Sequence, residues 1–418
     1  MRKLKFILII FLLFVIYIYV SFISLLPDKI FLINNENFKL RKLPGIDFAE
    51  TIITNNSNED NEKKSYSIEE KMRIGNTNIT NIEIRILGNI LLKNIEVVKI
   101  DEVKVVPVGK IIGLKLYTNG VLVVGMSEIE DKNNYMKKPY DSSDIKPGDT
   151  ILEINEQIIE DIDGLKKVIN ESNGNKLNLK ILRNGNIINT NIIPLEVENK
   201  KYQLGLWVKD AATGVGTMSF YEPTTKTFGI LGHGIVDADT GNLININSGE
   251  LVTAQVISLT KGEENIPGEI KGTIINSQMI GEIKKNTQFG VFGTLNNLTS
   301  LNIDTSRELK IANRDEIKEG DAQILCSINS SNVAKEYKIE IQKIYRENDY
   351  NNKSMLIKIT DEELVKETGG IIRGLSGAPI IQNGKFVGAI TNVLVSNPQI
   401  GYAVFADMMI RELKEVVD

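Results

Sequence analysis

A serine between glycines and a lone histidine, also between glycines, are the residues best suited to nucleophilic chemistry in this chain. Ser376 lies in the segment GLSGAP, and His233 is the only histidine among the 418 residues. A serine hydroxyl attacks a carbonyl only when a nearby base takes its proton, and imidazole suits that role because its pKa lies near neutrality. Either residue alone could be structural, in a tight turn or a strand-to-loop connection. If the fold brings them together, they predict acyl transfer.

The backbone around Ser376 could also stabilise a tetrahedral intermediate. Gly374 and Gly377 permit a tight turn, and the N–H groups of Gly374 and Ser376 would then hold the oxyanion. The segment that follows, IIQNGKFVGAI, alternates and turns at Asn383-Gly384, which predicts strand, turn and strand. An α/β-hydrolase would have a helix at that point. The arrangement is similar to the nucleophile loop of chymotrypsin-fold serine proteases.

The aspartate that would orient the histidine is the least determined member of this group. Asp361 follows the apparent strand SMLIKIT and lies 15 residues before Ser376. The run Asp361-Glu362-Glu363 is equally typical of a helix start, with an N-cap and acidic residues in the first turn. Spacing alone does not choose between Asp361 and the alternatives, which are Asp237, Asp239, Asp304 and Asp315.

The composition excludes several other classes of protein. A net charge of −5 with scattered Lys and Arg gives no basic surface for nucleic acid. One cysteine, Cys326, excludes an intramolecular disulfide and a cysteine-rich zinc site, and one histidine excludes His-His metal motifs. We therefore expect no metal and no cofactor. A chain of 418 residues is too long for one hydrophobic core, so two or three domains are expected.

The N-terminal residues predict a membrane anchor. The run from Phe6 to Leu26 carries no charge and is long enough to cross a hydrocarbon core of about 30 Å. Arg2, Lys3 and Lys5 precede it, so the N-terminus should stay cytoplasmic. A cleaved signal peptide is the alternative, but the run exceeds a usual h-region and no A-x-A-like site closes it. We expect residues 1–27 to form a cytoplasmic tip and anchor.

Two further regions precede the part of the chain that carries Ser376 and His233. Residues 28–106 are expected to form a linker and a small β module, since apolar residues alternate from Asn81 to Val108. Residues 51–64 are polar and aperiodic, which predicts a flexible tether. Residues 107–197 resemble a PDZ domain, most closely the bacterial kind attached to proteases, through the run IKPGDTILEIN.

The PDZ resemblance implies a binding loop and a ligand. Ile112, Gly113 and Leu114 would form the carboxylate-binding loop, whose N–H groups hold a peptide end while the peptide adds as a β-strand. A structural domain without a ligand is the alternative. Residues 198–418 show short strands separated by Gly and Asn turns, followed by an amphipathic helical pattern at 406–417. The predicted fold is mainly β: a transmembrane helix, an α+β PDZ domain and a chymotrypsin-like double β-barrel.

These features together resemble the SpoIVB peptidase family, the stage IV sporulation serine proteases. The resemblance rests on the anchor, a PDZ-like segment before the protease region, and the blocks FGILGHGI and ITDEELVKETGGIIRGLSGAPIIQNGKFVGAIT. In that family the catalytic residues lie in the G-x-S-G, L-G-H and T-D blocks, which implies Ser376, His233 and Asp361 here. Relatives often carry a histidine where this chain has Asn392, so His233 is left as the only base.

The resemblance implies a role in endospore formation. Such a protein is a serine endopeptidase that cleaves itself and a membrane-protein regulator of sigma factor precursor processing. Its expected partners are its own chain and the regulatory subunit of an intramembrane protease complex, with no nucleic acid. The expected location is membrane-anchored, with an extracytoplasmic catalytic domain between forespore and mother cell. The uncharged edge Ala389 to Val393 favours a small or apolar residue before the cut. The alternative is a catalytically silent, membrane-tethered PDZ adaptor that binds peptide termini.

Overall fold

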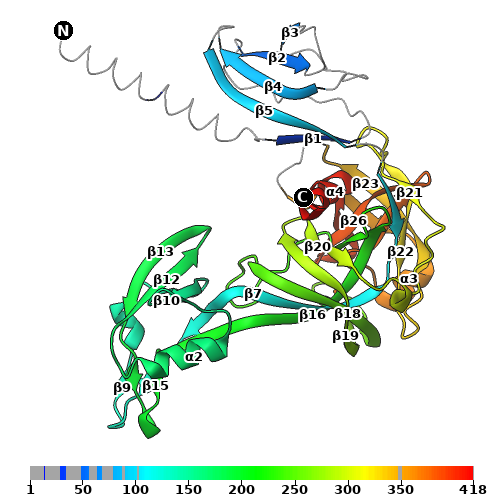
Figure 1. Cartoon of the computed structure of the whole chain (residues 1–418). Helices are drawn as coiled ribbons and strands as arrows, with labels where there is room; N and C mark the ends of the chain where they lie inside the picture. The colour runs from blue at the N-terminus through cyan, green and yellow to red at the C-terminus, as the bar shows by residue number, and fades with distance from the viewer. Residues whose placement is uncertain are drawn as a thin grey trace. The chain divides into compact units, whose positions relative to one another are not determined.

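The computed structural model describes Phe14, five strand segments (29–33, 49–55, 64–67, 79–86 and 90–100), and residues 103–346 and 351–417. Its contacts divide the chain into two compact units, Met1–Val103 and Lys104–Asp418 (Figure 1). Among the described residues, no helix is both long and apolar enough to span a bilayer. Apart from Phe14, the predicted anchor lies outside the described residues.

The first unit contains one five-stranded sheet in the order β1-β5-β4-β2-β3. β1 runs parallel to β5, and the other neighbours are antiparallel. This sheet lies within the range in which a linker and a small β module were expected, but residues 51–55, expected to be part of a flexible tether, are a strand. They belong to β2, where the β-branched run Thr51 to Thr54 pairs with β4. The strands are Lys29–Ile33 (β1), Ala49–Asn55 (β2), Lys64–Ser67 (β3), Ile79–Ile86 (β4) and Ile90–Ile100 (β5).

The second unit begins with a barrel of six antiparallel strands. The order is β7-β18-β19-β20-β17-β16, and β16 pairs back on β7 to close the ring. Leu114, Leu116, Phe228 and Leu251 are among the side chains that fill its interior. β6 (Lys104–Pro107) and β21 (Leu309–Lys310) extend the sheet beyond β16. The barrel strands are Ile111–Met126 (β7), Leu206–Glu222 (β16), Thr227–Ile230 (β17), Ile246–Thr260 (β18), Glu269–Thr287 (β19) and Gly290–Leu295 (β20).

A second closed barrel follows in the order β22-β23-β24-β27-β26-β25. Its core includes Ile339, Ile357, Phe386 and Phe405, which are almost completely buried. The C-terminal helix α4 (Ala406–Val417), predicted from its apolar spacing, packs on β17 and β20 of the first barrel and on β26 of the second. The other elements are Gly320–Cys326 (β22), Lys335–Ile344 (β23), Met355–Ile359 (β24), Glu362–Thr368 (α3), Pro379–Gln382 (β25), Lys385–Leu394 (β26) and Asn397–Phe405 (β27).

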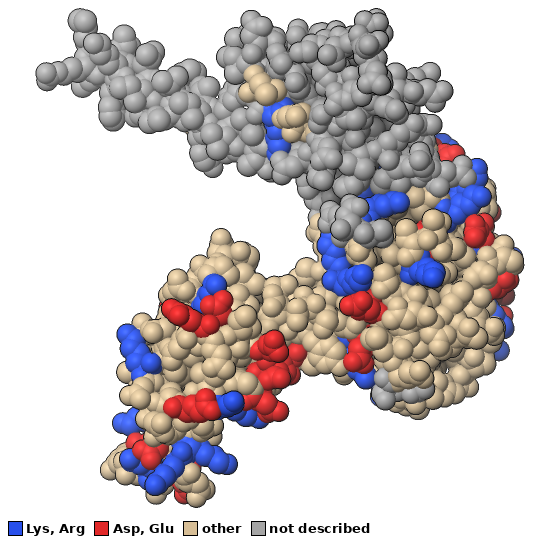
Figure 2. Space-filling view, viewed as in Figure 1, with Lys and Arg blue, Asp and Glu red and all other residues tan. Residues whose placement is uncertain are grey.

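Strands β7 and β16 continue out of the first barrel and form part of an α+β module, where they run side by side (Figure 1). The module's sheet continues from β7 through β10, β12 and β13, and helix α2 covers its core. Figure 2 shows acidic side chains over α2, where negative charge near a helix N-terminus is favourable. The elements are Ile129–Glu130 (β8), Met136–Lys137 (β9), Thr150–Ile154 (β10), Gln157–Ile158 (β11), Ile162–Glu171 (α2), Leu177–Arg183 (β12), Asn186–Ile192 (β13), Leu195–Glu196 (β14) and Tyr202–Gln203 (β15).

Ile112, Gly113 and Leu114 do not form the predicted carboxylate-binding loop. They lie inside β7, where Gly113 pairs with Val215 on one side and Val252 on the other. Ile112 and Leu114 are buried in the barrel, so this segment presents neither free N–H groups nor an open edge to a peptide. The predicted limits 107–197 include the whole of β7, which the barrel also uses, and leave out β16, the second strand that the barrel and the module share.

Candidate active site

Ser376 lies in a turn between α3 and β25. Gly374 and Gly377 flank it with φ values of +100° and +96°, a region that residues with a side chain rarely adopt. The Ser376 hydroxyl is half-buried, and its Oγ donates a 2.7 Å hydrogen bond to the carbonyl oxygen of Thr391 on β26. The serine is therefore held at the edge of the second barrel by a tight turn that depends on glycine.

His233 lies in a tight turn just after β17. Leu231 and Gly232 have φ values of +70° and +67°, and a positive φ in a leucine is a strain typical of functional sites. The half-buried imidazole places Nδ1 2.9 Å from the carbonyl oxygen of Gly234. A carbonyl oxygen only accepts, so this contact assigns the proton to Nδ1 and leaves a lone pair on Nε2. That is the tautomer a general base needs.

Thr217 on β16 bonds to both turns and brings them together. Its N–H donates to the carbonyl of Ser376 at 3.3 Å, and its own carbonyl accepts from the N–H of Leu231 at 3.2 Å. A Cβ added to Gly377 would lie 2.6 Å from Leu231 N, and one added to Gly232 would lie 3.2 Å from Thr391 Cγ2. The serine turn and the histidine turn are therefore in direct contact across the two barrels.

Two backbone N–H groups beside Ser376 are available for an oxyanion. In the part of the chain that the structure describes, neither Gly374 N nor Ser376 N donates a hydrogen bond. Thr217 Oγ1 donates to the carbonyl of Gly374 at 2.6 Å and so fixes the orientation of that peptide. Thr217 was missed by the sequence reasoning, because nothing in its segment marks it as a positioning residue. Both N–H groups could donate to an oxyanion, and the oxyanion hole at Gly374 and Ser376 stays a prediction.

The environment of the imidazole keeps it neutral. Burial lowers the pKa of His233 from its usual value, because the charged ring loses solvation, and the bond to the Gly234 carbonyl offsets part of this effect. A histidine with a lowered pKa stays unprotonated at neutral pH. A neutral imidazole can accept a proton from a hydroxyl placed beside it.

Asp361 caps helix α3 in this structure. Its Oδ1 accepts from the N–H of Leu364, and its Oδ2 accepts from the N–H of Lys338 on β23, both at 3.2 Å. No hydrogen bond between Asp361 and His233 occurs among the described residues. The helix start that its sequence allowed is therefore present, and the orienting role implied by the family resemblance stays a prediction. Through the cap, Asp361 also fixes the segment that leads to the oxyanion donors.

The two roles of Asp361 are separable by substitution. Asparagine caps helices about as well as aspartate, whereas alanine costs about 1 kcal/mol. If the cap is what matters, Asp361→Asn should retain most peptide hydrolysis and Asp361→Ala should lose more, as measured by kcat/KM. Loss of roughly 10⁴-fold in both variants would instead assign Asp361 to the orientation of His233.

The side chains of three of the other four aspartates have partners elsewhere. Asp237 is buried, accepts from Thr240 N and contacts Lys209, which also pairs with Asp239. Asp304 accepts from Ser306, and the backbone carbonyl of Asp315 accepts from Lys318. None of the four donates to or accepts from His233 in the described structure. Among the described residues, Nδ1 is held by the Gly234 carbonyl alone.

A loop with the same residue pattern as the predicted carboxylate-binding loop leads into β16. Leu204, Gly205 and Leu206 repeat the apolar-Gly-apolar pattern of Ile112 to Leu114, and Gly205 has a φ of +71°. In the described chain, the N–H groups of Leu204 and Gly205 donate no hydrogen bond. From Leu206 to Asp210, β16 pairs only with β7, so its other edge is open beside α2. The repeat of the pattern in the sequence could have pointed to this loop.

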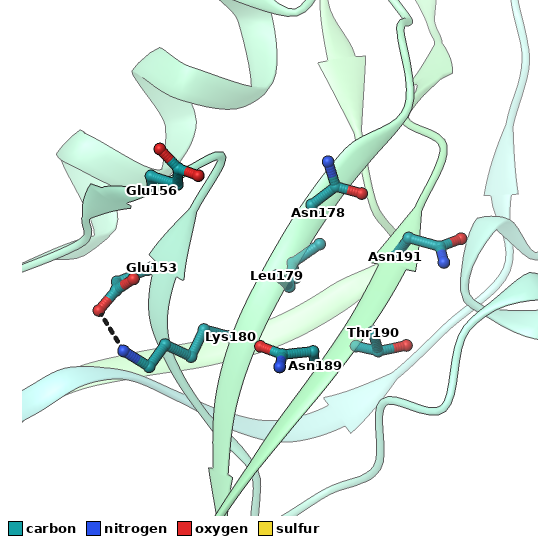
Figure 3. Close-up of a pocket in the computed structure, with 8 residues that line it drawn as sticks. All are labelled: Glu153, Glu156, Asn178, Leu179, Lys180, Asn189, Thr190 and Asn191. Carbon is teal, nitrogen blue, oxygen red and sulfur yellow. Dashed lines mark hydrogen bonds and ion pairs between the residues drawn. The ribbon is translucent and has the colours of Figure 1, made fainter.

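A shallow hollow of about 360 Å³ lies on the sheet of the module and not at Ser376 (Figure 3). Lys180 and Glu153 form an ion pair at its edge, 2.7 Å apart. The lining contains neither Ser376 nor His233, so the hollow is separate from the candidate active site. It is formed by Glu153, Glu156, Asn178, Leu179, Lys180, Asn189, Thr190 and Asn191.

Comparison with solved structures finds proteases of low similarity. The active form of the Rv3671c protease from M. tuberculosis is 13% identical over 49% of this chain and 74% of that one, with a TM-score of 0.27. The HtrA-type protease AlgW with a tripeptide is 11% identical over 49% of this chain and 56% of that one, with a TM-score of 0.29. No curated protein matches the chain.

Two family models match the sequence. Residues 115–193 match the PDZ domain, which agrees with the α+β module between the strands of the first barrel. Residues 200–410 match the SpoIVB peptidase S55 model, and this half of the chain contains both turns of the Ser376–His233 site. The chain therefore belongs to the SpoIVB peptidase S55 family and is a serine peptidase.

Proposed function

We propose that Ser376 is the nucleophile and His233 the general base of a peptide-bond hydrolase. The contact that carries this proposal is Thr217, which bonds to the serine turn and to the histidine turn. Ser376 Oγ attacks the peptide carbonyl while His233 Nε2 takes its proton and later gives it to the leaving amine. The N–H groups of Gly374 and Ser376 hold the oxyanion. The Gly234 carbonyl keeps the imidazole in the reactive tautomer.

In its cellular setting, the chain is proposed to act in sporulation signalling. Membership of the family supports an endopeptidase that cleaves itself and a membrane-protein regulator of sigma factor precursor processing. The uncharged run at residues 6–26 supports an anchor that holds the catalytic unit outside the cytoplasm. The protein partners on this proposal are the chain itself and the regulatory subunit of an intramembrane protease complex.

Active-site labelling tests the proposed nucleophile. A fluorophosphonate forms a covalent bond only with a serine whose hydroxyl is activated. The folded protein should be labelled, and peptide mapping should locate the label on Ser376. Heat-denatured protein, which has the serine but not the site, serves as the control. Folded protein that takes no label would contradict the proposal and favour a silent adaptor.

A second proposed activity is the binding of a peptide C-terminus by the PDZ module. The unbonded N–H groups of Leu204 and Gly205 would hold the carboxylate, and the peptide would add to the open edge of β16 from Leu206 to Asp210. Asp210 Oδ2 already accepts from Ile162 N, so the far end of this edge is fixed against α2. On this proposal, the strand that binds the peptide, β16, is also the strand that carries Thr217.

Hydrogen exchange tests where the peptide binds. A peptide with a free C-terminus should slow exchange of the amides from Leu204 to Asp210. The amides from Ile112 to Leu114, already in the barrel sheet, should not change. A C-terminally amidated peptide is the control and should give little protection, because it lacks the charge that the loop holds. Equal protection by both peptides would contradict carboxylate recognition.

A further inference from the structure

The end of β26 offers an open strand edge next to Ser376. β25 pairs with β26 only through Lys385 to Ala389, and Ile390 N and O then bond to Ala378 O and Gly377 N. From Asn392 to Leu394, β26 pairs with β27 alone. A substrate strand can therefore add along this edge, with its scissile carbonyl at Ser376 Oγ.

The position of the scissile carbonyl determines where the side chain of the substrate residue before the cut must lie. The oxyanion is held by Gly374 N and Ser376 N, and the substrate backbone lies along Asn392 to Leu394. The side chain before the cut is then directed between the end of β26 and the segment 370–374. The floor of this space is β27, where Gly401 pairs with Val393.

The side chain of Ile371 covers β27 at this point. A Cβ added to Gly401 would lie only 2.5 Å from Ile371 Cδ1, so the isoleucine side chain rests directly on that glycine. Ile371 is 2% exposed, and its N–H donates a 2.7 Å hydrogen bond to the carbonyl of Pro398. The bond to Pro398 joins the segment to the start of β27. The isoleucine is therefore a fixed part of the wall, and little depth remains above it.

We propose that Ile371 sets the specificity of the peptidase and restricts the residue before the scissile bond to glycine, alanine or serine. A larger side chain would have to displace a packed isoleucine, and a charged one would meet an apolar floor without a partner. This inference rests on the proposed role of Ser376 as the nucleophile. The uncharged segment Ala389 to Val393 favoured any small or apolar substrate residue before the cut. The present proposal narrows that preference to small residues.

The test uses two adjacent isoleucines of similar burial. Ile371 and Ile372 are 2% and 1% exposed, but Ile372 Cγ2 faces Gly262 and Gly268 instead of Gly401. Peptide libraries that vary only the residue before the cut give kcat/KM for alanine and leucine. Ile371→Ala should raise the leucine-to-alanine ratio at least about tenfold, the usual effect of one or more methylenes in a pocket. Ile372→Ala should leave that ratio unchanged.

The outcomes distinguish failure of the role proposed for Ile371 from failure of the role proposed for Ser376. A ratio measured within one variant is independent of the fraction that folds, and Ile371→Val, which removes one methyl group, replaces Ile371→Ala if the latter is insoluble. Wild-type protein that prefers leucine or phenylalanine before the cut would overturn the inference, as would equal ratios in the two alanine variants. Wild-type protein that takes no fluorophosphonate on Ser376 would overturn the proposed nucleophile instead.

Discussion

Ser376→Ala is expected to abolish self-cleavage and to lower peptide hydrolysis by about three to six orders of magnitude. The variant keeps the oxyanion donors and the substrate edge but has no hydroxyl to form the acyl-enzyme. The measurement is kcat/KM on a peptide substrate, together with the amount of full-length chain after expression. Contaminating peptidases limit the lowest rate that this assay can measure. The same preparation should therefore be tested for fluorophosphonate labelling, which detects other serine peptidases.

Ser327→Ala is the matched control for this substitution. Ser327 is completely buried, and its Oγ has no hydrogen-bond partner among the described residues. Its loss should therefore leave hydrolysis almost unchanged. Undiminished self-cleavage of Ser376→Ala, in the absence of any wild-type chain, would show that another residue is the nucleophile.

The hydrogen bond of Ser376 implies that its hydroxyl must rotate when substrate binds. In the structure Oγ donates to the Thr391 carbonyl, so the hydroxyl has to turn toward Nε2 of His233 before attack. Catalytic hydrogen bonds often form fully only in the substrate complex. A substrate strand beside Asn392 would lie next to Thr391 and so is well placed to drive that rotation.

The sequence predicted the local parts of this molecule better than their pairing. The turn at Asn383-Gly384, helix α4 and the Gly-flanked loops of Ser376 and His233 follow from patterns within short stretches of sequence. The partners of a strand do not, because an alternating run says only that a strand forms. Ile112 to Leu114 and Leu204 to Leu206 share one pattern, and only the register of β7 shows that the first is barrel core.

The supporting residues of the site were beyond prediction for a related reason. Thr217 and Ile371 make their contacts with residues far away in the sequence. Thr217 lies in no motif, and Ile371 lies in the block of Ser376 without being marked by its pattern. Asp361 shows the opposite problem. Its motif is recognisable, but one carboxylate can cap a helix or orient an imidazole, and only the fold shows which N–H groups it accepts from.

His233→Ala is expected to lower hydrolysis by several orders of magnitude and to remove the acid limb of the pH profile. In the wild type, kcat/KM should fall only below about pH 6.5, the ordinary histidine value, because burial lowers the pKa of His233. The sign follows from the role of the base: acid protonates Nε2, which can then no longer accept the serine proton. The measurement is kcat/KM from pH 5 to 8 on one peptide.

The pH profile is direct to interpret because the chain has one histidine, so no second imidazole can cause a fall in kcat/KM over the same pH range. Residual hydrolysis by His233→Ala should therefore lack a step in this range. Asp304→Asn is the control, since Asp304 bonds to Ser306 and not to His233 in the described structure, and the substitution leaves the imidazole and its bond to Gly234 in place. If the acid limb persists in His233→Ala with the same midpoint, a carboxylate is the base, and the contact between the two turns serves only to join the barrels.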